Sequence, residues 1–282
     1  MLARLAPFLF VFLWSTGFLG AKFGLPHAEP LAFLFVRYLL VISLMTSIAL
    51  AWRASWPRDF CHWLHIGVSG LLVHALYLGG VFMAIGKGLP AGITALVVGV
   101  QPLLTATVAG RLLGESVVPR QWAGLVLGFV GVALVVSNKI GHGFALDALW
   151  PALAALLGIT CGTLYQKKFA PHFDWRSGSV AQFLPTAIVT GLIVFATDSF
   201  RIDWTGEFLF ALGWLVLVLS VGAISLLNWL IRHGSAVNVA SLFYLTPPTT
   251  ALLAWLLFGE TLTGTALTGM ALAVWGVYLS RR

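Results

Sequence analysis

The sequence predicts an all-α integral membrane protein in which ten transmembrane helices form two inverted five-helix repeats. Three observations predict this fold: an apolar composition, ten apolar runs of membrane-spanning length, and an internal repeat. Hydrophobic residues make up 60% of the 282-residue chain and charged residues 9%, with a mean hydropathy of +0.97. A soluble globular protein has about 25% charged residues, so this chain has too few to cover a water-facing surface.

Each apolar run is close to the roughly 20 residues that a helix needs to cross the hydrocarbon core of a lipid bilayer. The connectors between the runs are short, so we expect no separate soluble domain. The ten runs cover residues 5–21, 31–52, 62–86, 90–111, 119–137, 147–166, 178–197, 207–231, 236–258 and 264–280.

Cationic residues indicate the orientation. With the N-terminus in the cytoplasm, the inner connectors carry 11 Lys and Arg residues and the outer connectors carry 4. Cytoplasmic loops are enriched in these residues, so we predict that both termini are cytoplasmic. The net charge of +7 then reflects topology, and no nucleic-acid partner is expected. The inner residues are Arg4, Arg53, Arg58, Arg111, Arg120, Lys167, Lys168, Arg176, Arg232, Arg281 and Arg282, and the outer ones are Lys22, Lys87, Lys139 and Arg201.

The first apolar run, which follows Arg4, could be mistaken for a cleaved signal peptide. Its removal would spoil the alternation of charge, so we expect a retained helix.

Cys61 and Cys161 are too few and too badly placed for a disulfide framework or a metal site, and we expect free thiols. There is no Walker motif, so ATP is not expected to act directly, and no cofactor or metal is expected.

The internal repeat aligns residues 91–134 with 236–279 without a gap, and 14 of the 44 aligned positions are identical. Helices rich in Leu, Ala and Gly often match by chance, but they rarely align Pro, Gly-Glu and spaced Gly at one offset. We therefore predict a duplication, with repeats over residues 1–141 and 142–282. The aligned pairs are Pro102 and Pro247, Gly114-Glu115 and Gly259-Glu260, Gly124 and Gly269, and Gly131 and Gly276.

Five spans per repeat is an odd number, so two halves of the same fold must enter the membrane from opposite sides. The pseudo-two-fold axis then lies in the membrane plane, as in many secondary transporters, which bind substrate between the repeats. Lys22-Phe23 and Lys168-Phe169 support this equivalence at an offset of 146 residues.

Along its whole length, the chain resembles the ten-helix EamA-type members of the drug/metabolite transporter superfamily. The resemblance implies a carrier of small organic metabolites in the plasma membrane or bacterial inner membrane, and not an enzyme. Known relatives export amino acids and similar compounds, but the resemblance does not name the substrate. The residues that carry it are Trp14-Ser15, Arg37, Gln101-Pro102-Leu103, Gly114-Glu115 and Pro247 with Gly259-Glu260.

Pro102 and Pro247 interrupt equivalent spans, because a proline in a helix cannot donate to the carbonyl four residues earlier. Freed carbonyls in a membrane are tolerated where protein or a water-filled cavity satisfies them. Binding sites in duplicated transporters favour corresponding interrupted helices. We therefore predict two kinked helices that line the pathway and bend during gating, with Gln101 as a substrate contact. A static kink that only shapes packing is the alternative.

His74 lies inside the run 62–86, and Tyr77 follows one helical turn later on the same face. Intramembrane histidines usually face the bundle interior or a cavity, and histidine titrates near neutral pH. We predict that His74 contacts substrate, with an interhelical hydrogen bond as the alternative. Further candidate substrate contacts, for which packing or helix–helix hydrogen bonding is the alternative, are Trp14, Tyr77, Tyr165, Asn228, Ser241 and Tyr244.

Three charged residues are expected to be structural. Arg37 is the one basic residue well inside a span, and we expect it to pair or to cap carbonyls, with binding of a substrate carboxylate as the less favoured alternative. Glu115 and Glu260 precede the last span of each repeat, where a carboxylate can accept hydrogen bonds from the free N–H groups of the following helix.

No Asp or Glu lies in the middle of a span, so we favour facilitated or weakly coupled transport over a proton-coupled efflux antiporter. The expected substrate is zwitterionic or neutral, such as an amino acid, and the aromatic candidates favour aromatic amino acids. An intramembrane enzyme acting on lipid would need clustered carboxylates, which are absent.

Pairs of small residues such as Gly124 and Gly128 form either the wall between repeats or a homodimer face; one chain can hold a complete transport unit.

Overall fold

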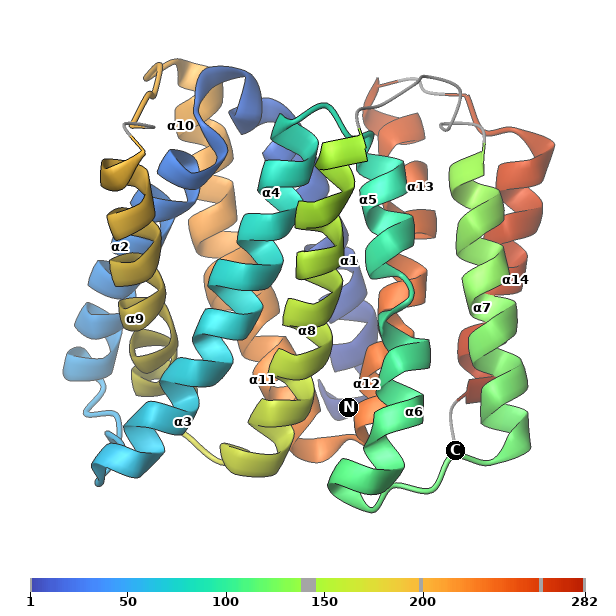
Figure 1. Ribbon diagram of the computed structural model, residues 1–282, viewed down its shortest axis with the longest axis horizontal. Helices are drawn as coiled ribbons and strands as arrows, with labels where there is room; N and C mark the ends of the chain where they lie inside the picture. The colour runs from blue at the N-terminus through green and yellow to red at the C-terminus, as the bar shows by residue number, and fades with distance from the viewer. Residues whose placement is uncertain (1, 138–145, 198–199, 259–260, 281–282) are drawn as a thin grey trace.

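The computed structural model describes residues 2–137, 146–197, 200–258 and 261–280, and within them the chain forms ten helical rods (Figure 1). Four of these rods change helix type or break along their length. The rods are α1 (Leu2–Gly24), α2 (Pro30–Ala51), α3 (Phe60–Gly70) with η2 (Leu71–Leu78) and α4 (Gly79–Gly86), α5 (Ala91–Val98) with α6 (Gln101–Leu113), α7 (Pro119–Ser137), α8 (Leu149–Phe169), α9 (Trp175–Ala196), α10 (Gly206–Trp214) with η4 (Leu215–Ala223) and α11 (Ile224–His233), α12 (Ala236–Ser241) with η5 (Leu242–Leu245) and α13 (Thr246–Phe258), and α14 (Gly264–Ser280).

Local chemistry accounts for most of the helix ends. Pro30 and Pro119 begin α2 and α7, where a missing N–H leaves no hydrogen bond unmade. Side-chain oxygens of Asp59, Asp174 and Ser235 accept from backbone N–H groups in the first turns of α3, α9 and α12. These helices therefore start where the sequence supplies a proline or a capping oxygen.

Eight of the rods are long and apolar enough to cross a bilayer, from residues 30 to 257. Two shorter apolar stretches, Leu5–Gly17 within α1 and Gly264–Ser280, complete the bundle. Large apolar side chains such as Leu50, Leu192 and Phe195 stand exposed on its outside, as the lipid-facing surface of a membrane protein requires. The predicted all-α membrane fold is confirmed.

Successive rods alternate in direction, and both termini lie toward the same end of the bundle (Figure 1). The packing is symmetric between the halves. The rod containing η2 packs on α8, and the rod containing η4 packs on α1. In the same way α6 packs on α8 and α13 packs on α1, while α2 pairs with α9 and α7 with α14. Each of these contacts is matched by the contact between the corresponding rods of the other half, so the two halves pack on each other in equivalent ways.

Helices α7 and α14 meet at their glycines. A Cβ placed on Gly124 would lie 2.6 Å from the carbonyl oxygen of Gly276, and one on Gly131 would lie 2.7 Å from that of Gly269. Backbones can approach this closely only where side chains are absent. The small residues of these two spans therefore form the contact between the two repeats. Of the two alternatives that the sequence left open, wall between repeats or homodimer face, these glycines form the wall.

Helix irregularities also recur at equivalent places. The π-helical stretches η2 and η4 lie at the centres of the third and eighth rods. The fourth rod breaks between Val98 and Gln101, and the ninth tightens into the 3₁₀ turn η5 just before Thr246. Both breaks lie immediately before the predicted prolines, Pro102 and Pro247. π-Helical stretches and broken spans often mark functional sites in membrane proteins, so these four positions direct attention to the centre of the bundle.

Candidate functional site

Two adjoining cavities lie inside the bundle, on either side of an aromatic pair. The first is lined by α1, α2, η2, α4, η4 and α11, and the second by α1, η2, α4, α5, η5 and α13. Trp14, Tyr77 and Val81 line both cavities. The rings of Trp14 and Tyr77 stack with centroids 6.2 Å apart and planes inclined by 11°, so this pair separates the two spaces.

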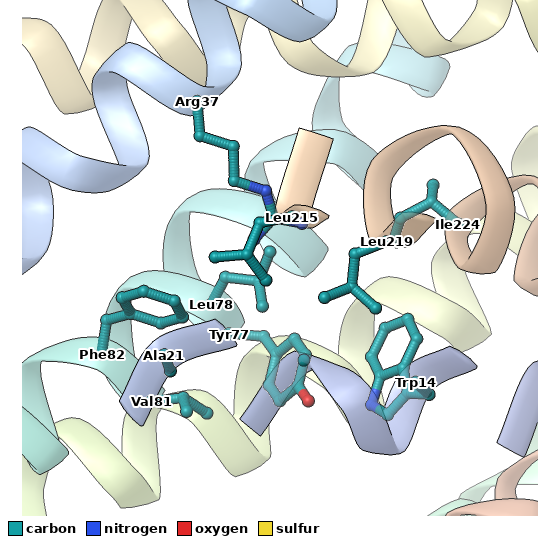
Figure 2. Close-up of a pocket in the computed structure, with 11 residues that line it drawn as sticks. Trp14, Ala21, Arg37, Tyr77, Leu78, Val81, Phe82, Leu215, Leu219 and Ile224 are labelled. Atoms are coloured by element: carbon teal, nitrogen blue, oxygen red, sulfur yellow. The ribbon is translucent and has the colours of Figure 1, made fainter. Parts of the chain in front are cut away.

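The first cavity combines aromatic walls with a single charge. Figure 2 shows Arg37 extending into it from α2, with Trp14 and Tyr77 on the opposite side. Phe82 and Leu215 complete much of the apolar wall. The space has room for only a few water molecules. A solute the size of an amino acid therefore requires the helices to move apart.

Arg37 makes one hydrogen bond in the described part of the chain: its Nε donates to Ser220 Oγ at 3.1 Å. Ser220 in turn donates to the carbonyl of Leu215 at 3.1 Å, which fixes the hydroxyl as an acceptor for Arg37. The arginine side chain is 1% exposed, and no described carboxylate lies within ion-pair distance of it. The expectation that Arg37 pairs with another charge or caps carbonyls is thus not met among these residues.

Tyr77 and His74 do not share a face, contrary to the prediction from α-helical spacing. Their segment is π-helical, and its wider turn takes residues three apart out of alignment. Tyr77 lines both cavities, whereas the His74 ring stacks on Phe183 of α9 with centroids 4.1 Å apart. Neither ring nitrogen of His74 has a hydrogen-bond partner among the described residues, and the side chain is buried. His74 therefore lies behind the cavity wall.

The interrupted helices reach the second cavity on both sides. Gly99 and Val98 line it at the break in the fourth rod, and Thr246 and Pro247 line it at the break in the ninth. Gln101 is fully buried beside Pro102, and both polar atoms of its side chain lack partners in the described chain. Pro247 thus borders the cavity directly, while Gln101 and Pro102 lie outside its lining.

Asn228 belongs to a ring of three amides that joins α8, α9 and α11. Gln166 donates to Asn228 at 3.0 Å, Asn228 donates to Gln182 at 3.3 Å, and Gln182 donates back to Gln166 at 3.2 Å. Gln182 also donates to Ser69 Oγ of α3 at 3.1 Å. Asn228 is therefore held by other helices, as the alternative of helix–helix hydrogen bonding expects, and it also lines a larger pocket at the end of the bundle.

The remaining candidates lie away from both cavities. Tyr165 forms a 2.7 Å hydrogen bond with His65 near the end of α8. Ser241 donates to the carbonyl of Asn238 in its own helix at 2.8 Å. Tyr244 is fully buried, packs against Gly128 of α7 and has no partner for its hydroxyl among the described residues. Of the eight candidate contacts, the structure brings Trp14 and Tyr77 together at the cavities.

Glu115 caps a helix, but not the one predicted. Gly114 ends α6 with a left-handed backbone, φ +70°, which glycine adopts readily. After this turn both carboxylate oxygens of Glu115 accept from the N–H of Ala236, the first residue of α12, at 2.9 Å. The following helix, α7, begins with proline and offers no N–H at that position. Glu115 therefore connects the two halves, and Glu260 lies outside the described residues.

Lys167 extends this connection. Its ammonium lies 3.9 Å from Glu115, donates to the carbonyl of Ile231 at 3.1 Å, and also donates to that of Gly234. The last carbonyls of α11 carry partial negative charge and the first N–H groups of α12 partial positive charge. Lys167 and Glu115 thus neutralise both sides of the α11–α12 junction.

Replacing Glu115 by alanine is expected to destabilise the protein by about 1–2 kcal/mol, because a half-buried helix cap is lost. The same replacement at Glu207, whose side chain is 72% exposed, should change stability by less than about 0.5 kcal/mol. Unfolding midpoints of the purified variants in detergent would compare the two. Equal effects would show that the contact with Ala236 contributes nothing.

A third, larger pocket opens at the end of the bundle where both termini lie, between α1, α9 and α11. Its lining includes the charged residues Asp174, Arg176 and Arg232. Hydrogen bonds from the Arg176 guanidinium, the nearest 2.6 Å long, lower the pKa of the Asp174 carboxyl.

Cys61 and Cys161 are free and exposed. No group of three His, Cys, Asp or Glu side chains that could hold a metal is found among the described residues.

Sequence reasoning missed two residues that matter here, Ser220 and Gln182. Both were ordinary polar residues in apolar runs, where nothing local distinguishes them from other intramembrane Ser and Gln residues. Their partners, Arg37 and Asn228, lie 183 and 46 residues away in the chain, so only the fold brings them together. The cavity wall formed by Phe82 and Leu215 was equally hidden among many apolar side chains.

Ten helical rods in the described chain, eight of them long and apolar enough to cross a bilayer, surround cavities beside equivalent broken helices and define a helical membrane transporter. The chain belongs to the EamA-like transporter family, which matches residues 1–137 and 148–282. The resemblance drawn from the paired Pro and Gly-Glu motifs is thereby confirmed.

Individual relatives agree along nearly the whole chain. It is 30% identical to the uncharacterized transporter YvbV of Bacillus subtilis, covering 98% of this chain and 90% of the relative. It is 27% identical to a probable amino-acid metabolite efflux pump of Salmonella typhimurium, covering 96% and 92%. A crystal structure with 22% identity superposes with a TM-score of 0.80 and covers 98% of this chain and 94% of the other, which shows the same fold.

Proposed function

We propose that the protein is an alternating-access carrier that exports amino acids or closely related metabolites, with aromatic side chains favoured. The observation that carries the proposal is the stacked pair of Trp14 and Tyr77 between two cavities bordered by broken helices. Residues 1–141 and 142–282 form the two halves that rock against each other. Relatives named as probable amino-acid metabolite efflux pumps support the substrate class.

The narrow cavities support a cycle with at least one contracted state, since a solute must widen them to bind. The carrier would lie in a plasma membrane or bacterial inner membrane with both termini cytoplasmic. Arg53, Arg111, Lys168 and Arg232 lie near the ends of rods at the terminus-bearing side, as the positive-inside rule requires. One chain would hold a complete transport unit.

Uptake of a labelled amino-acid panel into proteoliposomes tests this function. We expect saturable flux without a proton gradient, reduced at least tenfold in Trp14→Ala because the wall between the cavities is lost. Trp150→Ala, which removes a tryptophan that is 72% exposed, should transport like the wild type. His74→Ala, behind the wall, should also retain flux.

The result with a pH gradient distinguishes the alternative, a proton-coupled antiporter. Flux that depends on the gradient would favour coupling, and its loss in His74→Ala would place the proton there. No flux for any member of the panel would overturn the proposed substrate class.

A further inference from the structure

Arg37 is the one Lys, Arg, Asp or Glu side chain that is buried in the part of the chain that the structure describes. An isolated charge in an apolar interior is strongly unfavourable unless it is paired and hydrogen-bonded. Intramembrane charges accordingly face cavities and pair with other groups. Arg37 faces a cavity, but its described hydrogen bond is to a neutral hydroxyl, and no acidic side chain among the described residues balances its charge.

The direction of the side chain excludes the simplest structural explanations. A snorkelling arginine would carry its guanidinium toward the membrane surface, whereas that of Arg37 points inward and its side chain is 1% exposed (Figure 2). The Nε group is committed to Ser220. A guanidinium has five N–H donors, so this single bond leaves its outer edge free to hold a planar anion in two parallel hydrogen bonds.

The rest of the first cavity favours an apolar body attached to that anion. Trp14, Tyr77 and Phe82 supply aromatic surface, and Leu215 and Leu219 supply aliphatic surface. Among the described residues that line the cavity, none is acidic. An ammonium group on the solute would therefore be brought close to Arg37 without a counter-charge, which is unfavourable.

We infer that this cavity binds aromatic or apolar monocarboxylates through Arg37, and that a free ammonium group on the solute lowers its affinity. The inference rests on the proposed carrier function and narrows its substrate class. Ser220 acts as a positioning residue, since its hydroxyl holds the guanidinium edge toward the cavity. Deaminated or N-acylated aromatic amino acids are then better substrates than the amino acids themselves.

The test compares two ligands of equal shape, 3-phenylpropionate and the neutral 3-phenylpropanamide. Their binding to the purified protein in lipid nanodiscs is measured by calorimetry for wild type, Arg37→Gln and Ser220→Ala. The amide cannot form the charge-assisted hydrogen bonds that the carboxylate forms with Arg37. We therefore expect the wild type to bind the carboxylate roughly ten- to a hundredfold more tightly than the amide. Phenylalanine should bind less tightly than 3-phenylpropionate.

Arg37→Gln is expected to reduce this preference to near one, and Ser220→Ala to reduce it severalfold. Ser69→Ala is the matched control, because Ser69 is equally buried but lies in the amide network outside the cavity. A merely structural role for Arg37 would weaken both ligands together and leave their ratio unchanged, which would overturn the inference. A wild-type ratio near one would overturn it as well.

If Arg37→Gln does not fold, Arg37→Lys keeps the charge and removes the fork of donors. The preference should then fall but stay above one, and an unchanged preference would contradict bidentate binding. Flux of labelled N-acetylphenylalanine into proteoliposomes separates the inference from the carrier function. Binding without flux would overturn the carrier and retain the site, flux without a carboxylate preference would do the reverse, and absence of both would overturn both.

Discussion

Replacing Gly276 by alanine is expected to destabilise the protein by about 1–3 kcal/mol through overpacking. Its new Cβ would lie 2.6 Å from the carbonyl oxygen of Gly124 and 2.6 Å from the Cα of Gly128. Both neighbours are backbone atoms, so α7 and α14 must separate along their whole contact. Detergent unfolding of the purified variant, followed by circular dichroism, measures the loss.

Gly213→Ala provides the matched control. Gly213 also lies inside a membrane helix, but a Cβ there would have no neighbour within 4 Å. Because alanine favours a helix over glycine by about 1 kcal/mol, this variant should be as stable as the wild type or more so. A Gly276→Ala protein of wild-type stability would mean that the helices are not in backbone contact.

Replacing Gln182 by leucine is expected to destabilise the protein by about 2 kcal/mol, because it opens the ring of amides. Gln166 loses the donor to its carbonyl oxygen, and Asn228 loses the acceptor for its amide. Ser69 loses a donor as well. Each of these buried groups would then bear the cost of desolvation without a partner.

Gln101→Leu is the control for this second effect. Gln101 is as buried as Gln182, but neither polar atom of its side chain has a partner among the described residues. Removing an unpaired amide should leave stability unchanged or increase it. Equal losses in the two variants would show that the hydrogen bonds of the ring add nothing beyond packing. Unfolding midpoints measured under one detergent condition give the comparison.

The fold was predictable because its strongest determinants are local. Apolar runs fix the spans, and Pro102 and Pro247 fix the breaks that the structure shows at those places. An odd number of spans per repeat then requires inversion, whatever the side chains do. These features depend on residue type and spacing alone, and both are visible in the chain.

The site was only partly predictable, because it depends on helix rotation and on partners distant in sequence. The π-helical turn separates Tyr77 from His74, and no residue type announces such a turn. Glu115 was correctly expected to cap a helix, but the N–H group that donates to its carboxylate belongs to Ala236, 121 residues away. Arg37 was recognised as unusual, yet only the assembled bundle shows which groups face its guanidinium.

The glycine contacts between α7 and α14 have a consequence for assembly. Gly124 corresponds to Gly269 in the repeat and Gly131 to Gly276, and each glycine meets the counterpart of the other. This reciprocity, in which i touches j and j touches i, is the defining property of an isologous interface between two identical subunits. The chain thus contains, within one polypeptide, the contact by which two copies of a five-helix protein would form a symmetric dimer.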